Sequence, residues 1–223
     1  MTREPLLPPL RDRIRPGVRV LFVGINPGIR SALTGHHFAG FSNRFWKLLY
    51  ESGLAPEPIS SRDDDRLPDW GYGITNIVPR PTPGIDTLRP DEYVAGRLRL
   101  RRKVYRFRPR ILAAVGVTVY RALFPARKGP VRLGAQLERV GSAAVFVLPN
   151  PSGRNANFTY AEMLAAFRAL REAAGALSPG AAGVPPLRDT PDARHSGRSS
   201  AESAPRREMR HGRRRGTRDP AAT

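Results

Sequence analysis

Four short apolar runs, separated by stretches with helical periodicity, constrain the fold of this chain more than any other feature. The runs cover residues 18–23, 72–78, 111–115 and 144–148. The helical stretches cover residues 43–50, 91–108, 117–123 and 159–174. Strands that alternate with helices predict βαβ units and parallel neighbours in one sheet. We therefore expect an α/β fold of three layers, in which helices cover both faces of a central, mostly parallel four-stranded sheet.

The end of the chain differs from the rest in composition. Residues 178–223 contain almost no large apolar side chain, so they cannot bury enough surface to offset the entropy of ordering. We expect one folded domain over residues 1–177, followed by a disordered basic tail over residues 178–223. Of the formal net charge of +19, the tail carries +5 and the domain carries +14.

This excess of positive charge favours nucleic acid as the partner, because each phosphate that a cation neutralises releases counterions. A solvated, arginine-rich surface without a ligand is the alternative. Eight of the cations lie within residues 97–110, and on one helix they cannot all share a face. The charge therefore indicates a class of partner and leaves the contacting residues open.

Several absences narrow the chemistry. The chain has no cysteine, which excludes disulfides, thiolate metal sites, iron–sulfur clusters and cysteine nucleophiles. His36 and His37 are adjacent, and on a strand they would point in opposite directions, so we expect no metal and no cofactor. No apolar run approaches the length of a membrane span, and no secretory signal is visible. We expect a monomer in the cytoplasm, associated with the nucleoid through DNA.

Polar loops follow three of the predicted strands. They cover residues 24–28, 76–82 and 150–155 and are rich in glycine, proline and asparagine. Each loop alone is a weak signal, because turns of this composition are common. In a parallel sheet, ligands bind beyond the carboxyl ends of the strands, so the three loops should converge on one site.

Residues 18–177 resemble the mismatch-specific uracil/thymine DNA glycosylases, a branch of the uracil-DNA glycosylase superfamily. The similar stretches are VRVLFVGINPG (18–28), TGHHFAGFSNRFWKLLYESGL (34–54), YGITNIVPRPTPG (72–84) and VLPNPSGRN (147–155). The resemblance implies a uracil-DNA glycosylase-like fold and a function in base excision repair. Such an enzyme flips uracil, mispaired with guanine, out of double-stranded DNA and hydrolyses its N-glycosidic bond. Thymine and ethenocytosine are further candidate bases.

The resemblance also implies roles for individual residues. Asn26 matches the residue that holds the hydrolytic water, which an amide can orient but not strongly deprotonate. Phe38 matches the aromatic that stacks on the flipped base, and Gly28 leaves room for a substituent on the pyrimidine. Ile25 and Phe38 should offer backbone groups to the base, and the Asn76 amide should read its edge. Two structural alternatives stay open, namely Phe38 as a core residue and Asn76 as a turn cap.

A loop near the end of the domain matches the segment that enters the DNA stack in this family. It consists of Asn150, Pro151, Ser152, Gly153 and Arg154. Some relatives have leucine where this chain has Arg154. An arginine there could fill the gap left by the base, contact the opposite guanine or bind a phosphate.

Asp86 is a second candidate for catalysis, because a carboxylate is a stronger base than an amide. It follows the second predicted strand, on the side where the site should lie. We expect it to assist Asn26. The alternative is that Asp86 is an ordinary turn residue and that Asp91 caps the long helix.

Only three of the 38 basic residues are lysines, namely Lys47, Lys103 and Lys128. A glycosylase that also nicks DNA normally uses an amine to form a Schiff base. None of the three lysines lies in a motif loop, so we expect a monofunctional enzyme that leaves an abasic site. Two readings remain beside this one. The same fold could act on uracil in single strands or on deaminated purines, or the chain could be a non-catalytic basic DNA-binding protein.

Overall fold

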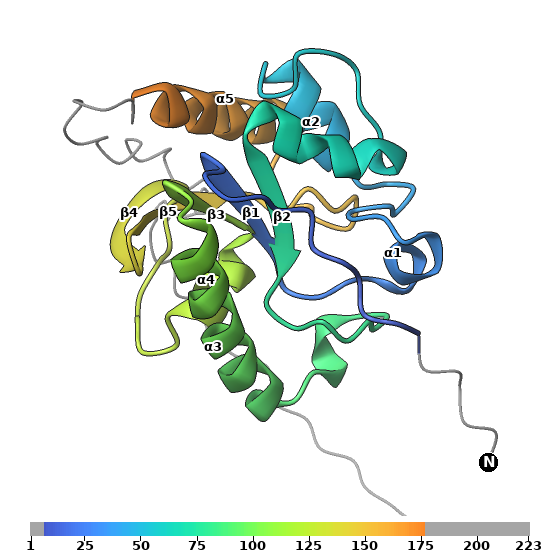
Figure 1. The fold of residues 1–223 in the computed structure, drawn as a ribbon, viewed down its shortest axis with the longest axis vertical. Helices are drawn as coiled ribbons and strands as arrows, with labels where there is room; N and C mark the ends of the chain where they lie inside the picture. The colour runs from blue at the N-terminus through green and yellow to red at the C-terminus, as the bar shows by residue number, and fades with distance from the viewer. Residues whose placement is uncertain (1–6, 177–223) are drawn as a thin grey trace, which may run out of the picture. The chain divides into compact units, whose positions relative to one another are not determined.

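The computed structural model describes residues 7–176, and a five-stranded sheet lies at their centre (Figure 1). The strands are β1 (Val20–Gly24), β2 (Tyr72–Asn76), β3 (Ile111–Val115), β4 (Gly134–Val140) and β5 (Ala143–Leu148). Their order across the sheet is β2-β1-β3-β5-β4, and every pair is parallel except the antiparallel pair of β4 and β5. The predicted α/β class and the mostly parallel sheet are confirmed, whereas the predicted number of four strands is wrong.

The fifth strand, β4, lies at the edge of the sheet, and this position explains why its sequence gives no apolar run. Only its first and last residues are buried, and Leu137 is 94% exposed. The strand joins β5 through a two-residue turn, in which Gly141 has a φ of 57°. Gly-Ser at positions 141 and 142 is a recognisable hairpin signal, and it is the feature that could have revealed the strand.

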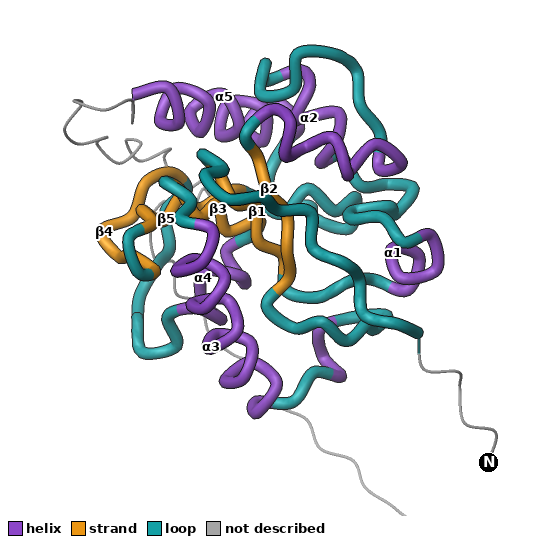
Figure 2. The backbone as a smooth tube through the Cα atoms, in the orientation of Figure 1, coloured by secondary structure: helices purple, strands orange, loops and turns teal. Residues whose placement is uncertain are grey.

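Helices cover both faces of the sheet (Figures 1 and 2). One face carries α2 (Phe45–Glu51) and α5 (Tyr160–Ala176), and the other carries α3 (Pro90–Phe107) and α4 (Val117–Leu123). Each face of the sheet packs into its own hydrophobic core, and successive side chains of β1 point into the two cores in turn. Phe22 packs with Phe45 and Phe167 on one face, while Leu21 and Val23 pack on the face that carries α3.

Three short helical elements were not predicted. They are α1 (Ile29–Thr34) and the 3₁₀ segments η1 (Ser61–Trp70) and η2 (Ile85–Thr87). Each is short or highly polar, so none shows a long apolar period. A capping box starts η1, because Ser60 accepts a hydrogen bond from Arg62 and Asp63 accepts one from the Ser60 backbone.

The long basic helix α3 begins one residue earlier than predicted, and Asp91 is not its cap. The N-cap is Arg89, whose backbone N–H donates to the Glu92 carboxylate at 2.9 Å, and Pro90 occupies the first turn. Asp91 lies within that turn and forms an ion pair with Arg89. The helix ends at Phe107, ahead of Pro109, because Arg108 adopts a left-handed conformation with a φ of 50°.

The parallel register brings the carboxyl ends of the strands to one edge of the sheet. Gly24 at the end of β1 lies opposite Asn76 at the end of β2. Beyond these residues, the Ile77 N–H donates to the Gly24 carbonyl at 3.0 Å and the Thr82 N–H donates to the Pro27 carbonyl at 3.1 Å. The loops that follow β1 and β2 are therefore joined to each other along this edge.

The predicted tail, residues 178–223, lies outside the described residues. Within residues 7–176, none of the helices combines the length and the apolar character that crossing a bilayer requires.

Gly96 sets how closely α3 packs against the end of β2, and its substitution tests this packing. A Cβ at position 96 would lie 2.6 Å from the Ile77 carbonyl oxygen, which is backbone and cannot rotate away. Although alanine is normally the better helix former, Gly96→Ala should lower the free energy of unfolding by about 1–3 kcal/mol through overpacking. Urea unfolding followed by circular dichroism measures the change.

Gly175→Ala on α5 is the matched control, because a Cβ at position 175 meets no atom within 4 Å. This substitution should leave the stability unchanged or raise it slightly. If both variants behave alike, the close approach of α3 to Ile77 does not limit the packing.

Candidate functional site

Asn26 lies in the loop after β1, and its side-chain nitrogen is held by three oxygens. The Nδ2 atom donates to the Thr82 hydroxyl at 2.7 Å, to the Pro27 carbonyl at 3.1 Å and to the Arg80 carbonyl at 3.3 Å. The Thr82 hydroxyl itself donates to the Gly84 carbonyl at 2.5 Å, so it can only accept from Asn26. These acceptors fix which end of the amide points inward.

The opposite end of the amide remains available. Among the described residues, no group donates a hydrogen bond to Asn26 Oδ1, and the side chain is half-buried. The loop that holds the nitrogen is itself anchored, because the Arg80 guanidinium binds both Glu92 oxygens at 2.8 Å. This pair also lowers the pKa of Glu92 to about 2. Asn26 thus offers a rigid hydrogen-bond acceptor at the edge of the sheet.

Asn76 lies beside Gly24 and depends on its having no side chain. A Cβ at Gly24 would lie 2.5 Å from Asn76 Oδ1 and 3.7 Å from the Phe38 ring. The Asn76 oxygen and the edge of the Phe38 ring therefore meet over Gly24. The structure places Asn76 and Phe38 next to each other, and it adds the close approach of Asn76 to Gly24, which the composition of the loop over residues 24–28 does not reveal.

His37 contacts the other end of the Asn76 amide. Its Nδ1 lies 3.5 Å from Asn76 Nδ2, and its Nε2 lies 3.1 Å from the Arg11 carbonyl. A carbonyl can only accept, so Nε2 carries the proton and Nδ1 accepts from Asn76. Burial lowers the pKa of His37, which keeps the ring neutral and suited to this pattern. The Asn76 amide is thereby oriented, with one N–H bound to His37.

Phe38 has a strained backbone, with a φ of 50°. Only glycine and a few polar residues adopt this conformation readily, and it costs an aromatic residue about 1 kcal/mol or more. Four side chains hold the peptide groups on either side of it, and they come from Asp64, Trp46, Ser31 and Arg30. The strain is therefore imposed by the surrounding structure, a situation that is typical of functional sites.

The four contacts act on the residues that flank Phe38. The His37 N–H donates to the buried Asp64 carboxylate at 2.8 Å, and Trp46 donates to the His37 carbonyl at 3.1 Å. On the other side, the Ala39 N–H donates to Ser31 at 3.1 Å, and Arg30 donates to the Ala39 carbonyl at 2.8 Å. The turn is thus fixed before and after the aromatic ring.

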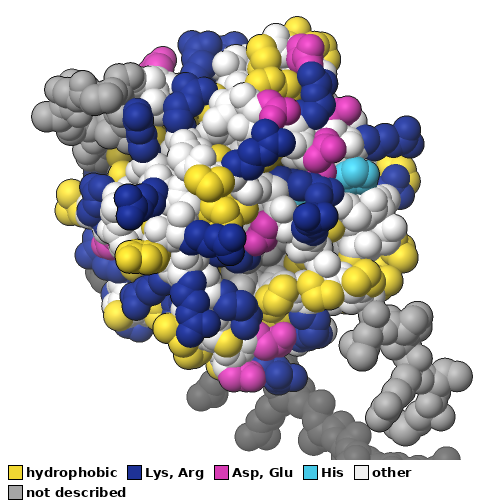
Figure 3. Space-filling model, viewed as in Figure 1, with side chains coloured by type: hydrophobic (Ala, Val, Ile, Leu, Met, Phe, Trp, Pro, Cys, Tyr) yellow, Lys and Arg dark blue, Asp and Glu magenta, His cyan; other side chains and the backbone are white. Residues whose placement is uncertain are grey.

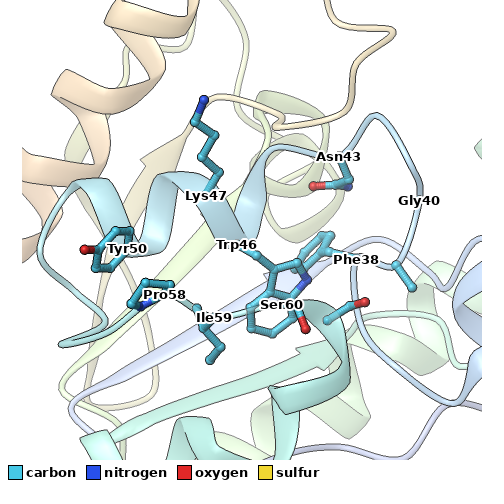
Figure 4. Close-up of a pocket in the computed structure, with 11 residues that line it drawn as sticks. Phe38, Gly40, Asn43, Trp46, Lys47, Tyr50, Pro58, Ile59 and Ser60 are labelled. Atoms are coloured by element: carbon cyan, nitrogen blue, oxygen red, sulfur yellow. The ribbon is translucent and has the colours of Figure 1, made fainter.

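One face of the Phe38 ring is stacked on the core. Its centroid lies 4.3 Å from that of Phe45, with an angle of 29° between the planes. A pocket of about 380 Å³ borders the same residue, and Trp46, Ile59, Ser60 and Tyr50 are among the residues that line it (Figure 4). Phe38 lines this pocket, whereas Asn26 and Asn76 do not.

The loop after β5 is attached to the segment that precedes α2. The Arg44 N–H donates to the Pro151 carbonyl at 2.9 Å, and a Cβ at Gly153 would collide with Ser42. Inside the loop, Asn150 Oδ1 accepts from the Ser152 N–H at 3.0 Å, which is an Asx turn. The Arg154 side chain is exposed and makes no ion pair within the described residues.

The comparison with known families gives a match over nearly all of the described residues. The model of the Uracil DNA glycosylase superfamily matches residues 12–171, which include the sheet, the Asn26 loop, the Phe38 turn and the loop after β5. The chain belongs to this superfamily. It is therefore a DNA glycosylase of the uracil class, a hydrolase of DNA repair that acts on DNA.

The remaining predicted residues of the glycosylase site have simpler surroundings. Gly28 is exposed, and a Cβ there would meet no atom within 4 Å. The Ile25 side chain is buried, and its carbonyl accepts from the Val78 N–H at 2.8 Å. Asp86 is exposed in η2, with its carboxylate 3.5 Å from a Cβ built at Gly84. Asp86 makes no direct contact with Asn26.

The lysines of this glycosylase lie outside the loops that carry the motifs. Lys103 forms an ion pair with Asp12 at 2.6 Å and donates to Thr75 at 2.8 Å. Lys47 lines the 380 Å³ pocket, but its ammonium group points away from Phe38 in Figure 4 and lies 3.7 Å from Glu51.

Sequence reasoning missed several residues that hold the site of the glycosylase. Thr82 lies in a loop already singled out for its polarity, and that position was the available signal. Asp64, Ser31 and Arg30 gave no signal, because a single polar residue in a loop or short helix does not reveal its partner. His37 was considered only as a metal ligand, whereas its contacts are with Arg11 and Asn76.

The buried His37 should make stability depend on pH. Its pKa is lowered in the folded state from an ordinary value of about 6.5, so the unfolded chain binds this proton more tightly. The contribution of His37 is therefore fully present above pH 7 and is lost as the pH falls through about 6.5 towards the folded-state pKa.

Urea unfolding at pH 7.5 and at pH 5.8 measures this effect. The free energy of unfolding of the wild-type protein should be lower at pH 5.8 than at pH 7.5. The decrease should be smaller for His37→Gln, because glutamine does not titrate. An equal decrease in both proteins would show that His37 does not titrate differently in the folded state.

Proposed function

We propose that the protein flips uracil mispaired with guanine out of double-stranded DNA and hydrolyses its N-glycosidic bond. The observation that carries this proposal is the orientation of Asn26, whose nitrogen is fixed by Thr82, Pro27 and Arg80 while Oδ1 is left to accept from water. Such an amide can orient a water molecule towards the sugar but cannot deprotonate it strongly. The reaction therefore suits a sugar that has gained positive charge as the base leaves.

The base would lie between Phe38 and Asn76. One face of the Phe38 ring is taken by Phe45, so the other face is the one that can stack on a base, a contact worth about 1–3 kcal/mol. Asn76 has one N–H and its Oδ1 to offer, which match the O4 and N3–H groups of uracil or thymine. The open space at Gly28 supports tolerance of a substituent on the pyrimidine ring.

The loop over residues 150–154 would enter the duplex from the side of α2. Arg154 is exposed and has no ion pair with the carboxylates that the structure describes; its planar guanidinium can stack in the gap, and its donors match guanine O6 and N7. The Asx turn at Asn150 and the contact of Gly153 with Ser42 support a stiff loop that can hold this position. We assign Arg154 two roles, namely to fill the gap that the flipped base leaves in the stack and to contact the guanine that was paired with that base.

The reaction should stop at the abasic site. A lyase step needs an amine close to the sugar, and the ammonium groups of Lys103 and Lys47 are engaged with Asp12 and Glu51. For Asp86 we propose an assisting role, supported by its place in the loop that contains Thr82 and Gly84. That role is electrostatic, because Asp86 does not touch the Asn26 amide.

An alkali-cleavage assay under single-turnover conditions tests the proposal. The substrates are labelled duplexes with G·U, A·U, G·T and G·ethenocytosine, together with single-stranded DNA that contains uracil. Alkali-labile product should form fastest from G·U. Asn26→Ala should lower that rate by about 100-fold or more, as the loss of one oriented polar group does in other active sites.

Each other outcome changes a specific part of the proposal. The absence of product from all substrates would leave a DNA-binding protein without this activity. Strand breaks before alkali would rule out the monofunctional reaction, and equal rates on A·U or single strands would replace mismatch selectivity with a broader range. Asp86→Ala should lower the rate less than Asn26→Ala does, and a rate equal to that of the control Asp65→Ala would remove Asp86 from the mechanism.

A further inference from the structure

The segment from Tyr93 to Leu137 contains no acidic residue, although it forms most of the layer on one face of the sheet. It includes nearly all of α3, together with β3, α4 and the start of β4. Its basic residues are Arg97, Arg99, Arg101, Arg102, Lys103, Arg106, Arg108, Arg110, Arg121, Arg127, Lys128 and Arg132. An uninterrupted run of one sign of charge over a folded layer creates a strong local potential.

The helix α3, which holds half of these basic residues, runs from the catalytic edge of the sheet to the opposite edge. At its first turn Glu92 binds Arg80, whose carbonyl accepts from Asn26, so this end lies at the catalytic edge. At its last turn the Phe107 carbonyl accepts from the Gly17 N–H, close to where β1 begins, so that end lies at the opposite edge. With a rise of about 1.5 Å per residue, Arg106 lies roughly 21 Å along the axis from Glu92.

The outward side of α3 combines cations with isolated apolar groups. Leu100 and Val104 face the core, whereas Arg101, Arg102 and Arg106 are exposed. Leu98 and Tyr105, which are 52% and 81% exposed, lie on the outward side as well. In Figure 3, Lys and Arg side chains stand among scattered hydrophobic ones over α3 and α4.

Two of the cations on α3 already have structural partners, which separates them from the outward group. Lys103 is paired with Asp12, and Arg97 donates to the Ala122 carbonyl of α4 at 3.0 Å. By contrast, none of Arg101, Arg102 and Arg106 has an ion pair with a carboxylate of residues 7–176, and Arg106 lies over the ring of Phe107 at 5.2 Å. Self-repulsion of these groups would be relieved by a polyanion.

We propose that the outward side of α3, defined by Arg101, Arg102, Tyr105 and Arg106, is a second binding surface for duplex DNA, separate from the catalytic edge. The surface lies roughly 14–21 Å from Glu92 along the axis of α3, so we take it to bind a DNA segment other than the duplex at the catalytic edge, and the protein would bridge the two. The proposal rests on the DNA-binding character of the family and not on the base that is excised.

Duplex DNA fits this surface better than an acidic protein segment does. Val94 and Leu98 are exposed one turn apart, but Arg101 and Arg102 separate them from Tyr105, so the apolar groups form no continuous strip along α3 for a peptide. DNA phosphates, in contrast, can be bound by separate hydrogen-bond donors such as the arginines spaced along α3. Contacts of this kind supply almost all of the affinity in nonspecific DNA binding.

Counting the duplexes bound per protein tests the proposal. Sedimentation velocity of the full-length chain with a labelled, undamaged 16-base-pair duplex at low salt should give two duplexes per protein. The triple variant Arg101→Gln/Arg102→Gln/Arg106→Gln should bind one. With about 0.9 counterions released per phosphate contact, the three arginines should contribute about 2–3 to the salt slope of the second binding step of the wild-type protein.

A matched variant controls for the loss of three charges. Arg62→Gln/Arg168→Gln/Arg171→Gln changes exposed arginines on η1 and α5 and should still bind two duplexes. One duplex on the wild-type protein, as expected if this face binds only an acidic protein, would overturn the proposal. Two duplexes on the α3 variant would also overturn it, because the second site would then lie elsewhere, for example in the tail.

Single-turnover excision keeps this test separate from that of the proposed function. The α3 variant should release uracil from a short G·U duplex at the wild-type rate, since it leaves Asn26 and Asn76 untouched. If no protein releases a base, the proposed function fails while the duplex count still reports on α3. If excision proceeds but the count is one, only the second surface is lost.

Discussion

The buried carboxylate of Asp64 is the interaction on which the site depends most. It is fully inaccessible to solvent and accepts from Arg13 Nε at 2.9 Å, from His36 Nδ1 at 3.1 Å and from the His37 N–H at 2.8 Å. These contacts join the N-terminal segment, η1 and the turn that carries Phe38. A buried charge is tolerated only with such partners, so Asp64 holds three parts of the chain in one arrangement.

The other polar contacts of the site follow from that arrangement. With the His37 backbone fixed, its ring reaches Arg11 on one side and Asn76 on the other, and Asn76 in turn lies over Gly24. Asn26 is held separately by Thr82, through the loops that follow β1 and β2. The two amides are therefore oriented by hydrogen bonds to neutral groups. The charged groups, such as Asp64, hold the residues that contact the amides and do not contact the amides themselves.

How much of this could be predicted depends on the range of the interactions. The apolar runs of β1, β2, β3 and β5 are local, and they predicted the sheet class and the edge at which the polar loops lie. The edge strand β4 alternates too weakly in burial to be seen, although its Gly-Ser turn was a usable signal. The domain boundary near residue 177 and the tail stay predictions.

Contacts between distant residues explain the rest. Asn26, Phe38 and Asn76 were found through their resemblance to a family. Three of the contacts that orient them, namely Thr82 with Asn26, Asp64 with His37 and His37 with Asn76, join residues 27 to 56 positions apart in the chain. No periodicity links Asp64 to His37 or Thr82 to Asn26. Gly24 belongs to the polar loop over residues 24–28 that the sequence indicates, but only the structure shows that its missing side chain makes room for Asn76.

Excision by Asp64→Asn measures most directly whether this buried carboxylate holds the site. The substitution keeps the shape of the side chain but leaves Arg13 without its charge partner, and Asp65→Asn, at an exposed neighbouring position, is the control. Both proteins are compared with the wild type by single-turnover release of uracil from G·U duplexes, under conditions where circular dichroism shows them folded. The account predicts a rate at least tenfold lower for Asp64→Asn and unchanged for Asp65→Asn. A wild-type rate in the folded Asp64→Asn protein would contradict it.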